Sequence, residues 1–358
     1  MLKSLAKAAG FLAYLFITLE MIFMVTPFAL YYYSVYSPLL AGSLNHPAMA
    51  WLPAFFLPHL STEFLPSIGG LICLLGLVGF VLSAFQLYYA KFSRRGVVHS
   101  GFYKRIRHPQ YLLLALAGLG LLIVWPRFIL LIVYINMLWF YYLLARSEER
   151  RMEARHGKAY REERQRTWMF LPGEPGRRLQ QRVFGWIRNR RVRLIVIYAL
   201  SIPIVIGAAF VLRRISLGLT TRVVLPEQKV AAVSFLSGDE GKLRDLLKLA
   251  EGAEHVQKQI KGEDGWVLVQ AMQGKRAVVH VMIDAGMTRQ TAQDLKLVKE
   301  GVKLVFSRPQ GGSVLEQPFG ISVRWRPAFV AEMNDGNVSD VLPIEQNHFV
   351  GNPVMPVF

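Results

Sequence analysis

The sequence predicts an all-α polytopic membrane domain over residues 1–219, followed by an α+β domain with a ferredoxin-like order of elements over residues 220–358. Apolar residues make up 53% of the 358-residue chain, and the formal net charge is +18. Residues 1–219 contain 26 Lys and Arg against 8 Asp and Glu, whereas residues 220–358 contain 16 of each. The whole charge excess therefore belongs to the apolar part, which is typical of a membrane protein with cytoplasmic basic loops. It argues against nucleic-acid binding.

Five apolar segments predict five membrane spans. They cover residues 11–36, 68–90, 111–125, 128–145 and 194–212. The first is longer than the apolar core of a cleaved signal peptide, so we expect it to be retained. The second is rich in Gly, Ser and Ala, which let helices approach closely in lipid. Only Pro126 and Arg127 separate the third from the fourth, which predicts a tight antiparallel hairpin.

The distribution of basic residues predicts the topology. Residues 91–108 contain six Lys and Arg, residues 146–193 contain fifteen, and residues 37–66 contain none. Lys and Arg accumulate on the cytoplasmic side of a membrane. We therefore expect the N-terminus and both basic segments to be cytoplasmic, and residues 37–66 and 220–358 to lie outside an inner (plasma) membrane.

The C-terminal part alternates strand-like and helical segments. They are strand 230–235, helix 241–260, strands 266–272 and 277–283, helix 288–300 and strand 302–307. This order is that of a split βαβ fold, and a further strand, 320–326, and an irregular tail follow. The sole cysteine, Cys73, lies in an apolar segment, so we expect neither a disulfide nor a metal site.

The hairpin predicts a cluster of polar side chains where its two outer ends meet. They are Arg107, His108 and Tyr111 at the start of its first helix and Arg146, Glu148 and Glu149 at the end of its second. Basic residues alone would anchor the helices to lipid phosphates. Glu148 and Glu149 gain nothing from an anionic bilayer, and they oppose the helix dipole at this end. We therefore expect the cluster to have a function beyond anchoring, at the cytoplasmic membrane interface.

The residues around this cluster carry a motif, G-x-Y-x-x-x-R-H-P-x-Y, at Gly101–Tyr111. After it come the apolar hairpin, the pair Glu148-Glu149, Gly157 and Tyr160 at G-x-x-Y spacing, and Phe170-Leu171-Pro172. In this order the segment 68–172 resembles the membrane methyltransferases that include isoprenylcysteine carboxyl methyltransferase and phospholipid N-methyltransferases. Leu113 and His156 depart from the pattern, where the family often has glycine and usually has phenylalanine, and both departures bear on the acceptor pocket.

The resemblance implies S-adenosylmethionine as the methyl donor and a membrane lipid or lipidated molecule as the acceptor. The residues that it implies for cofactor binding are Tyr103, Arg107, His108, Tyr111, Glu148 and Tyr160. A guanidinium can pair with the cofactor's carboxylate, and carboxylates suit its sulfonium and ammonium groups. Arg146 and Glu149 lie three residues apart on one helical face. We assign Arg146 to orienting the acceptor, and Glu149 to polar stabilisation or to the role of base, while the acceptor itself, amine, carboxylate or thiol, stays open.

Two other classes of function also stay open. Sterol reductases are similar around the R-H-P motif and use NADPH, so a membrane reductase is one alternative, although the acidic pair with Gly157 and Tyr160 fits the methyltransferases better. The other is a non-catalytic subunit of a membrane complex. Residues 220–358 lie outside the resemblance, and such a domain could dock a protein partner.

Overall fold

The computed structural model describes most of the chain. The described residues are 18–44 except 20, 46–57, 64–93, 100–260 except 237, 265–274, 289–294, 301–309, 318–320, 323, 325–334 and 336–345. The predicted strand 277–283 and most of the predicted helix 288–300 lie outside the described residues.

The chain separates into two compact units. The first comprises Met1–Tyr32, Glu63–Trp125 and Leu130–Gly207, and the second comprises Tyr33–Thr62, Pro126–Ile129 and Ala208–Phe358. The second unit therefore combines two short segments of the apolar part with the region that forms the sheet. Helix α7 (Arg190–Gly218) runs from one unit into the other. The domain boundary between residues 219 and 220 accordingly stays a prediction.

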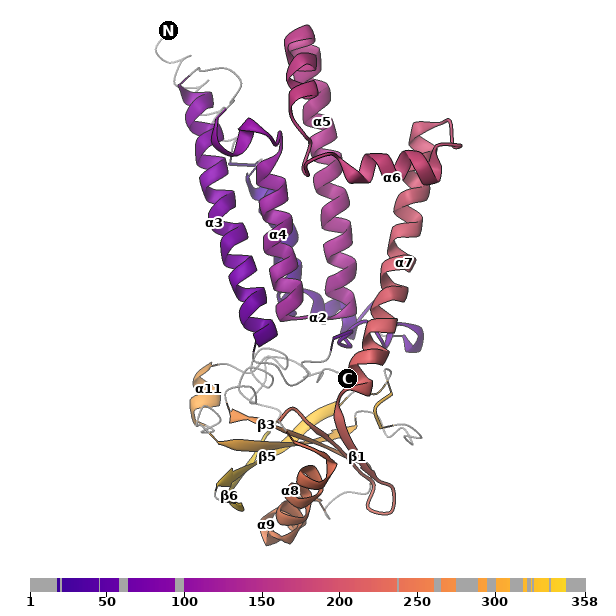
Figure 1. Cartoon of the computed structure of the whole chain (residues 1–358). Helices are drawn as coiled ribbons and strands as arrows, with labels where there is room; N and C mark the ends of the chain where they lie inside the picture. Colours follow the sequence, from indigo (N-terminus) through magenta and orange to yellow (C-terminus); the bar gives the residue numbers. More distant parts are fainter. Residues whose placement is uncertain are drawn as a thin grey trace. The chain divides into compact units, whose positions relative to one another are not determined.

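The first unit is helical. Its elements are η1 (Thr26–Tyr31), α3 (Phe64–Phe92), η3 (Gly101–Lys104), α4 (Pro109–Val124), α5 (Phe128–Arg166, from Leu130 on), α6 (Pro175–Phe184) and the first part of α7. Helices α3 and α4 lie side by side, and α6 runs across the direction of α5 (Figure 1). Pro109 occupies the first turn of α4, where its fixed φ suits a helix and its missing N–H costs nothing.

Three described helices are long and apolar enough to cross a membrane. They are Leu65–Ala90, Phe128–Arg155 and Arg190–Gly218, while Met21–Tyr31 and Pro109–Val124 are apolar but shorter. The prediction of five spans is therefore not confirmed. The described part of the first predicted span is not one continuous helix, because the chain passes from 3-10 helix into extended backbone at Tyr32 (φ −79°, ψ 130°) before α2 (Tyr33–Ala41) begins.

Small residues bring α3 and α4 into backbone contact, as the sequence predicts for the second apolar segment. A Cβ atom at Gly76 would lie 2.5 Å from the backbone nitrogen of Ala117, and one at Gly120 would lie 2.4 Å from that of Cys73. Leu113, which departs from the family pattern, contributes to the same interface, since its side chain lies 2.7 Å from a Cβ built at Gly79.

In the second unit, the short segment Pro126–Ile129 contains a buried arginine. Arg127, in the turn between α4 and α5, is 1% exposed, donates to the Tyr36 hydroxyl at 3.1 Å and lies 4.9 Å above the Phe55 ring. Arg213, near the end of α7, donates to the carbonyl oxygen of Phe55 at 2.6 Å. These contacts tie the segment around Phe55, after η2 (Pro47–Met49), to the turn and to α7.

The sheet has six described strands in sequence order. They are β1 (Thr221–Leu225), β2 (Val230–Ser234), β3 (Val267–Gln273), β4 (Val302–Pro309), β5 (Trp325–Asn334) and β6 (Asn337–Pro343). All neighbouring pairs are antiparallel except β2 and β3. A parallel pair needs a crossover connection, and α8 (Glu240–Gly252) and α9 (Glu254–Ile260) supply it (Figure 1). Helix α11 (Arg289–Asp294) precedes β4.

Side chains on both faces of the sheet are buried. On one face, Leu243 and Leu247 of α8 and Val256 of α9 pack on alternate residues of the strands. The Asp239 carboxylate caps α8 by accepting a hydrogen bond from the Lys242 amide at 3.0 Å. The other face contains an ion pair, Lys303 with Glu332, at 2.9 Å, and the two residues are direct partners across β4 and β5.

The structure differs from the sequence predictions at several points in this region. Strands β2, β3 and β4 lie where strands are expected, but the helix expected over 241–260 is broken at Ala253, which has extended backbone. Strand β1 lies where no element was predicted, and most of the β5–β6 hairpin lies where an irregular tail was predicted; β5 begins only at Trp325. The split βαβ arrangement is not confirmed, because β2 and β3 are hydrogen-bonded neighbours and leave no strand between them.

Candidate functional site

The segment that precedes α4 pairs with the segment that follows α5. The Arg107 amide donates to the Trp168 carbonyl at 2.8 Å, and the Trp168 amide donates to the Arg105 carbonyl at 2.8 Å. These two hydrogen bonds form a short parallel β-bridge between Ile106 and Trp168. Because this bridge lies next to the R-H-P motif, it sets the position of Arg107 and His108 relative to the end of α5.

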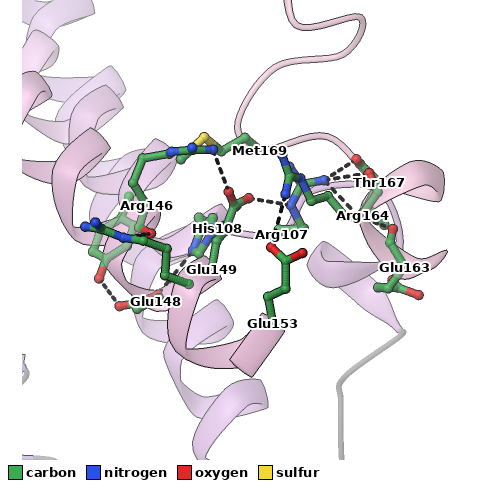
Figure 2. A network of polar contacts seen from close by, with 12 residues as sticks. Arg107, His108, Arg146, Glu148, Glu149, Glu153, Glu163, Arg164, Thr167 and Met169 are labelled. Atoms are coloured by element: carbon green, nitrogen blue, oxygen red, sulfur yellow. Dashed lines mark hydrogen bonds and ion pairs between the residues drawn. The ribbon is translucent and has the colours of Figure 1, made fainter. Parts of the chain in front are cut away.

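Glu149 of α5 lies between two guanidinium groups. One carboxylate oxygen accepts from Arg107 Nε at 2.8 Å, and the other accepts from Arg146 at 3.2 Å (Figure 2). Glu149 is 3% exposed. A buried carboxylate needs paired cations to remain charged, and the two arginines provide them. The structure thus brings together Arg107, Arg146 and Glu149, although α4 and nearly half of α5 lie between the first and the other two.

Glu148 interacts with the other side of the R-H-P motif. Its carboxylate accepts from the Tyr111 hydroxyl and lies 3.2 Å from His108 Nδ1. The His108 ring stacks on Tyr111 at 5.8 Å, and Tyr111 stacks on Tyr141 at 5.4 Å. His108 is 5% exposed, and its Nε2 has no hydrogen-bond partner in the part of the chain that the structure describes, although Glu149 lies 3.9 Å away.

Arg107 also contacts residues that the sequence reasoning missed. Its Nη1 donates to the Thr167 carbonyl, to the Thr167 hydroxyl at 3.2 Å and to the Arg164 carbonyl at 3.2 Å, while Nη2 lies 3.4 Å from Glu174. Glu174 accepts as well from the Met169 amide at 3.2 Å. It has left-handed backbone (φ 46°), which is uncommon for a residue other than glycine. The sequence signal for Glu174 was slight: an acid between Gly173 and Pro175 in a strongly basic segment.

Tyr160 lies beyond a kink in α5. Gly157 has φ 51° and ψ −115°, a conformation that favours glycine, and it interrupts the helix. The pKa of the Tyr160 hydroxyl is raised to about 12, chiefly by burial and also by the neighbouring Glu149 and Glu148, while Arg107 and Arg164 oppose the shift. These four charges place Tyr160 within the electrostatic reach of the cluster.

Tyr103 has a different environment from the other predicted cofactor residues. Its hydroxyl contacts the side-chain oxygen of Gln110 at 2.5 Å and the Ser83 carbonyl at 3.3 Å. Tyr103 and Gln110 are both buried. These contacts connect η3 to α3 and to the first turn of α4, so they hold the motif segment against the helices.

A cavity of about 690 Å³ lies beside the cluster. Four predicted site residues line it: Arg107, Tyr111, Arg146 and Glu149. The sequence reasoning missed the other polar residues of the wall, which are Arg164, Glu174, Gln180, Gln181, Arg190 and Arg193. Helix α6 and the start of α7 contribute most of these, and no motif in the sequence marks them. Leu113 is not among the lining residues that the structure describes, so its departure from the family pattern concerns the α3–α4 interface.

Comparison with protein families gives one finding. Residues 67–159 match the phospholipid methyltransferase family. The match confirms the resemblance over most of α3, all of α4 and α5 as far as Ala159, including the R-H-P motif, the acidic pair and Gly157. Helices α6 and α7 and the sheet lie outside it. Neither the curated proteins nor the solved structures contain a match to the chain.

Proposed function

We propose that this protein transfers a methyl group from S-adenosylmethionine to a lipid or lipid-like acceptor at the cytoplasmic membrane interface. The family match to phospholipid methyltransferases supports methyl transfer and a lipid substrate, and the apolar helices support a membrane location. The donor, the acceptor and the roles of single residues are our proposal.

The observation that carries the proposal is the gradient of polarity along the cavity wall. On α5 the lining residues change from Leu138, Trp139 and Tyr142 to Arg146 and Glu149. At about 1.5 Å per residue, Leu138 and Glu149 lie about 16 Å apart along the helix. An amphiphile can therefore place its chain against the apolar part of this wall while its polar end reaches the charged part.

Helices α4 and α7 of the wall have the same gradient. Arg107, just before α4, and Tyr111 in its first turn precede Leu112 and Ala115, and on α7, Arg190 and Arg193 precede Leu194 and Ile197. In each helix, the polar lining residues lie at the end that is connected to a basic segment. Three helices with parallel gradients fit a lipid acceptor better than a wholly soluble one.

The residue types of the cluster suit S-adenosylmethionine. When bound, this cofactor supplies an electrophilic methyl group on a sulfonium. We assign Arg107 to its carboxylate and Glu148 to its cationic part, and the stacked rings of His108 and Tyr111 to its adenosine. The buried His108 Nε2, which has no hydrogen-bond partner among the described residues, is available to a ligand. Tyr160 and Tyr103 remain proposed cofactor-binding residues. Tyr103 would act indirectly, by holding the motif segment against α3 and α4.

Arg146 and Glu149 lie at the acceptor side in our proposal. Arg146 orients the acceptor's polar end, and Glu149 stabilises cationic character at the reacting atoms or removes a proton from an amine acceptor. Both residues line the cavity, and their mutual contact of 3.2 Å fixes their orientation. Alignment of donor and acceptor in a site with little water supplies much of the acceleration in this kind of reaction.

We further propose that the catalytic face and the N-terminus are cytoplasmic, in the plasma (inner) membrane, and that residues 220–358 form an outer domain that can bind a protein partner. The basic segments 91–108 and 146–193 support this topology. Cys73 is the sole cysteine, so a Cys73→Ser chain with one new cysteine can be labelled selectively. A cysteine at Glu227 should react with an impermeant maleimide in intact cells, and one at Arg188 should react only after lysis. The reverse pattern would reject the topology.

A binding and turnover experiment tests the proposed reaction. Purified protein in lipid nanodiscs is titrated calorimetrically with S-adenosylhomocysteine and, separately, with NADPH. Methyl transfer from labelled S-adenosylmethionine is then followed into the lipid fraction of a membrane extract. We expect binding of S-adenosylhomocysteine but not of NADPH, and label in lipid. The converse binding result would favour the reductase, and binding of neither would favour a non-catalytic subunit.

A further inference from the structure

Helix α7 presents one stripe of residues to the cavity. Arg190, Arg193, Leu194 and Ile197 are its lining residues. They are spaced at i, i+3, i+4 and i+7, so they share one face of the helix. The stripe begins with two cations and continues with two apolar side chains. Because α7 lies outside the matched residues 67–159, the family comparison does not account for it.

The charges of the cavity wall are unequal. Five arginines and two glutamates line it. Arg107 and Arg146 pair with Glu149, and Arg164 lies 3.5 Å from Glu153. No ion pair of Arg190 or Arg193 is found among the described residues, and residues 175–218 contain no Asp or Glu. Arg190 and Arg193 of α7 are therefore the arginines of the wall for which no described carboxylate is a partner.

Arg193 has a second distinctive feature. Its Nε is buried and lacks a hydrogen-bond partner within the described part of the chain. A buried donor that makes no hydrogen bond costs free energy. An acceptor atom of a ligand in the cavity would satisfy this donor.

We propose that Arg190 and Arg193 form a binding subsite for the anionic group, a phosphate or carboxylate, of an amphiphile whose chain lies along Leu194 and Ile197. The subsite deepens the proposed function, on which it rests, because the amphiphile is the methyl acceptor. Guanidinium groups bind phosphate and carboxylate through paired hydrogen bonds. Arg193 and Ile197 are about 6 Å apart along the axis, so a headgroup at the arginines leaves the first methylenes against the apolar residues.

Contacts between α5 and α7 fix the subsite relative to Glu149. The Trp139 indole donates to the Ser201 hydroxyl at 3.1 Å and packs edge-on against Tyr198 at 5.6 Å. The Tyr198 hydroxyl in turn lies 2.7 Å from the Asn136 side-chain oxygen. These contacts hold α7 against the helix that carries Arg146 and Glu149. The α7 arginines therefore position the acceptor, while Arg146 remains beside the reacting end.

The test compares Arg193→Gln with Arg191→Gln in the full chain. Arg191 is an exposed neighbour on the same turn, and it does not belong to the described cavity wall. Binding of dioctanoyl phosphatidic acid, dioctanoylglycerol and inorganic phosphate to detergent-purified protein is measured by calorimetry. We expect the phosphatidic acid to bind best, and Arg193→Gln to weaken it about tenfold, which corresponds to about 1.4 kcal/mol. Arg191→Gln should leave it unchanged, and Arg193→Lys should recover part of the loss.

Several results would overturn the subsite. They are equal effects of Arg193→Gln and Arg191→Gln, equal binding of the charged and uncharged lipids, and inorganic phosphate that binds as tightly as the lipid. S-adenosylhomocysteine is titrated into the same samples, and Arg193→Gln should not change its affinity. If the native chain binds the anionic lipid through Arg193 but never binds S-adenosylhomocysteine, the proposed reaction fails while the subsite stands.

Discussion

Glu149 and Glu332 are both buried carboxylates that pair with cations, but their surroundings differ. Glu332 has Lys303 directly opposite it across β4 and β5, and both are buried within the sheet. Glu149 contacts two arginines from different segments, lies near His108 and lines a cavity. A carboxylate whose partners come from several segments around an open space can serve a ligand, whereas one matched by a single cross-strand cation serves the fold. Burial and pairing alone do not distinguish the two roles.

The largest effect on stability is expected from Glu332→Ala. It leaves the Lys303 ammonium buried without its carboxylate, and breaking a buried pair from one side costs about 3–5 kcal/mol. Hydrogen exchange of the β4 and β5 amides should rise strongly, while binding of S-adenosylhomocysteine stays unchanged. The double variant Lys303→Met with Glu332→Leu should recover most of the stability, and Glu227→Ala in an exposed turn is the control. Unchanged exchange in Glu332→Ala would show that the pair does not stabilise the sheet.

Glu149→Gln should act on ligand binding and turnover. It keeps the size of the side chain but removes the charge between Arg107 and Arg146, and we expect a loss of about 1.5–3 kcal/mol in cofactor affinity or in transition-state stabilisation. His108→Ala should weaken the same ligand. Titration with S-adenosylhomocysteine and the methyl-transfer assay measure both, with Glu162→Gln on the exposed part of α5 as control. If neither variant changes affinity or methyl transfer, the cofactor binds elsewhere.

Gly157→Ala should have a smaller effect, directed at the cluster rather than at the sheet. The space around a new Cβ is open, so the cost is that of the left-handed backbone, about 1–2 kcal/mol. A straightened α5 would carry Tyr160 away from Glu149. Thermal stability and cofactor affinity should both fall, whereas Gly252→Ala, at another open position with ordinary backbone at the end of α8, should lower neither. Identical behaviour of the two variants would contradict this account of the kink.

The smallest expected effect is the pH dependence contributed by Tyr160. Its folded-state pKa is raised from 10.0 to about 12, so between these values the unfolded chain loses the proton while the folded chain retains it. The stabilising contribution is complete below about pH 10 and is lost as the pH rises to about 12. The free energy of unfolding should fall less steeply in this window for Tyr160→Phe than for the native chain. Parallel curves would mean that the hydroxyl ionises equally in both states.

The local patterns of the sequence predicted the cluster because a two-residue turn makes the two helices of a hairpin antiparallel neighbours, so that their outer ends must lie close together. Arg107, Glu148 and Glu149 could therefore be brought together from spacing and charge. The positions of Arg193 and Glu174 in the cavity could not be predicted, because they depend on how α6 and α7 pack against α4 and α5. The periodicity of the sequence contains no information on this packing.

The sheet was predicted less completely for a different reason. Strands β2, β3 and β4 are rich in Val, Leu and Ala and are almost fully buried, so their composition identifies them. Strand β6 contains Asn, Ser, Asp and Pro and is mostly half-exposed, so it gives little strand signal without its partner β5. Strand order cannot be read from composition, which is why the split arrangement was expected and the direct β2–β3 pair was not.

The length of α5 makes the protein sensitive to bilayer thickness. Glu149 lies 21 residues after the start of the helix at Phe128, which is about 32 Å at 1.5 Å per residue, close to the hydrocarbon thickness of about 30 Å. A thicker bilayer would draw the Arg107–Glu149–Arg146 charges toward hydrocarbon or force α5 to become more upright, and a thinner one would lift the cavity mouth clear of the lipid headgroups. Under the proposed function, hydrophobic mismatch would thus control the access of lipid to the charged cluster.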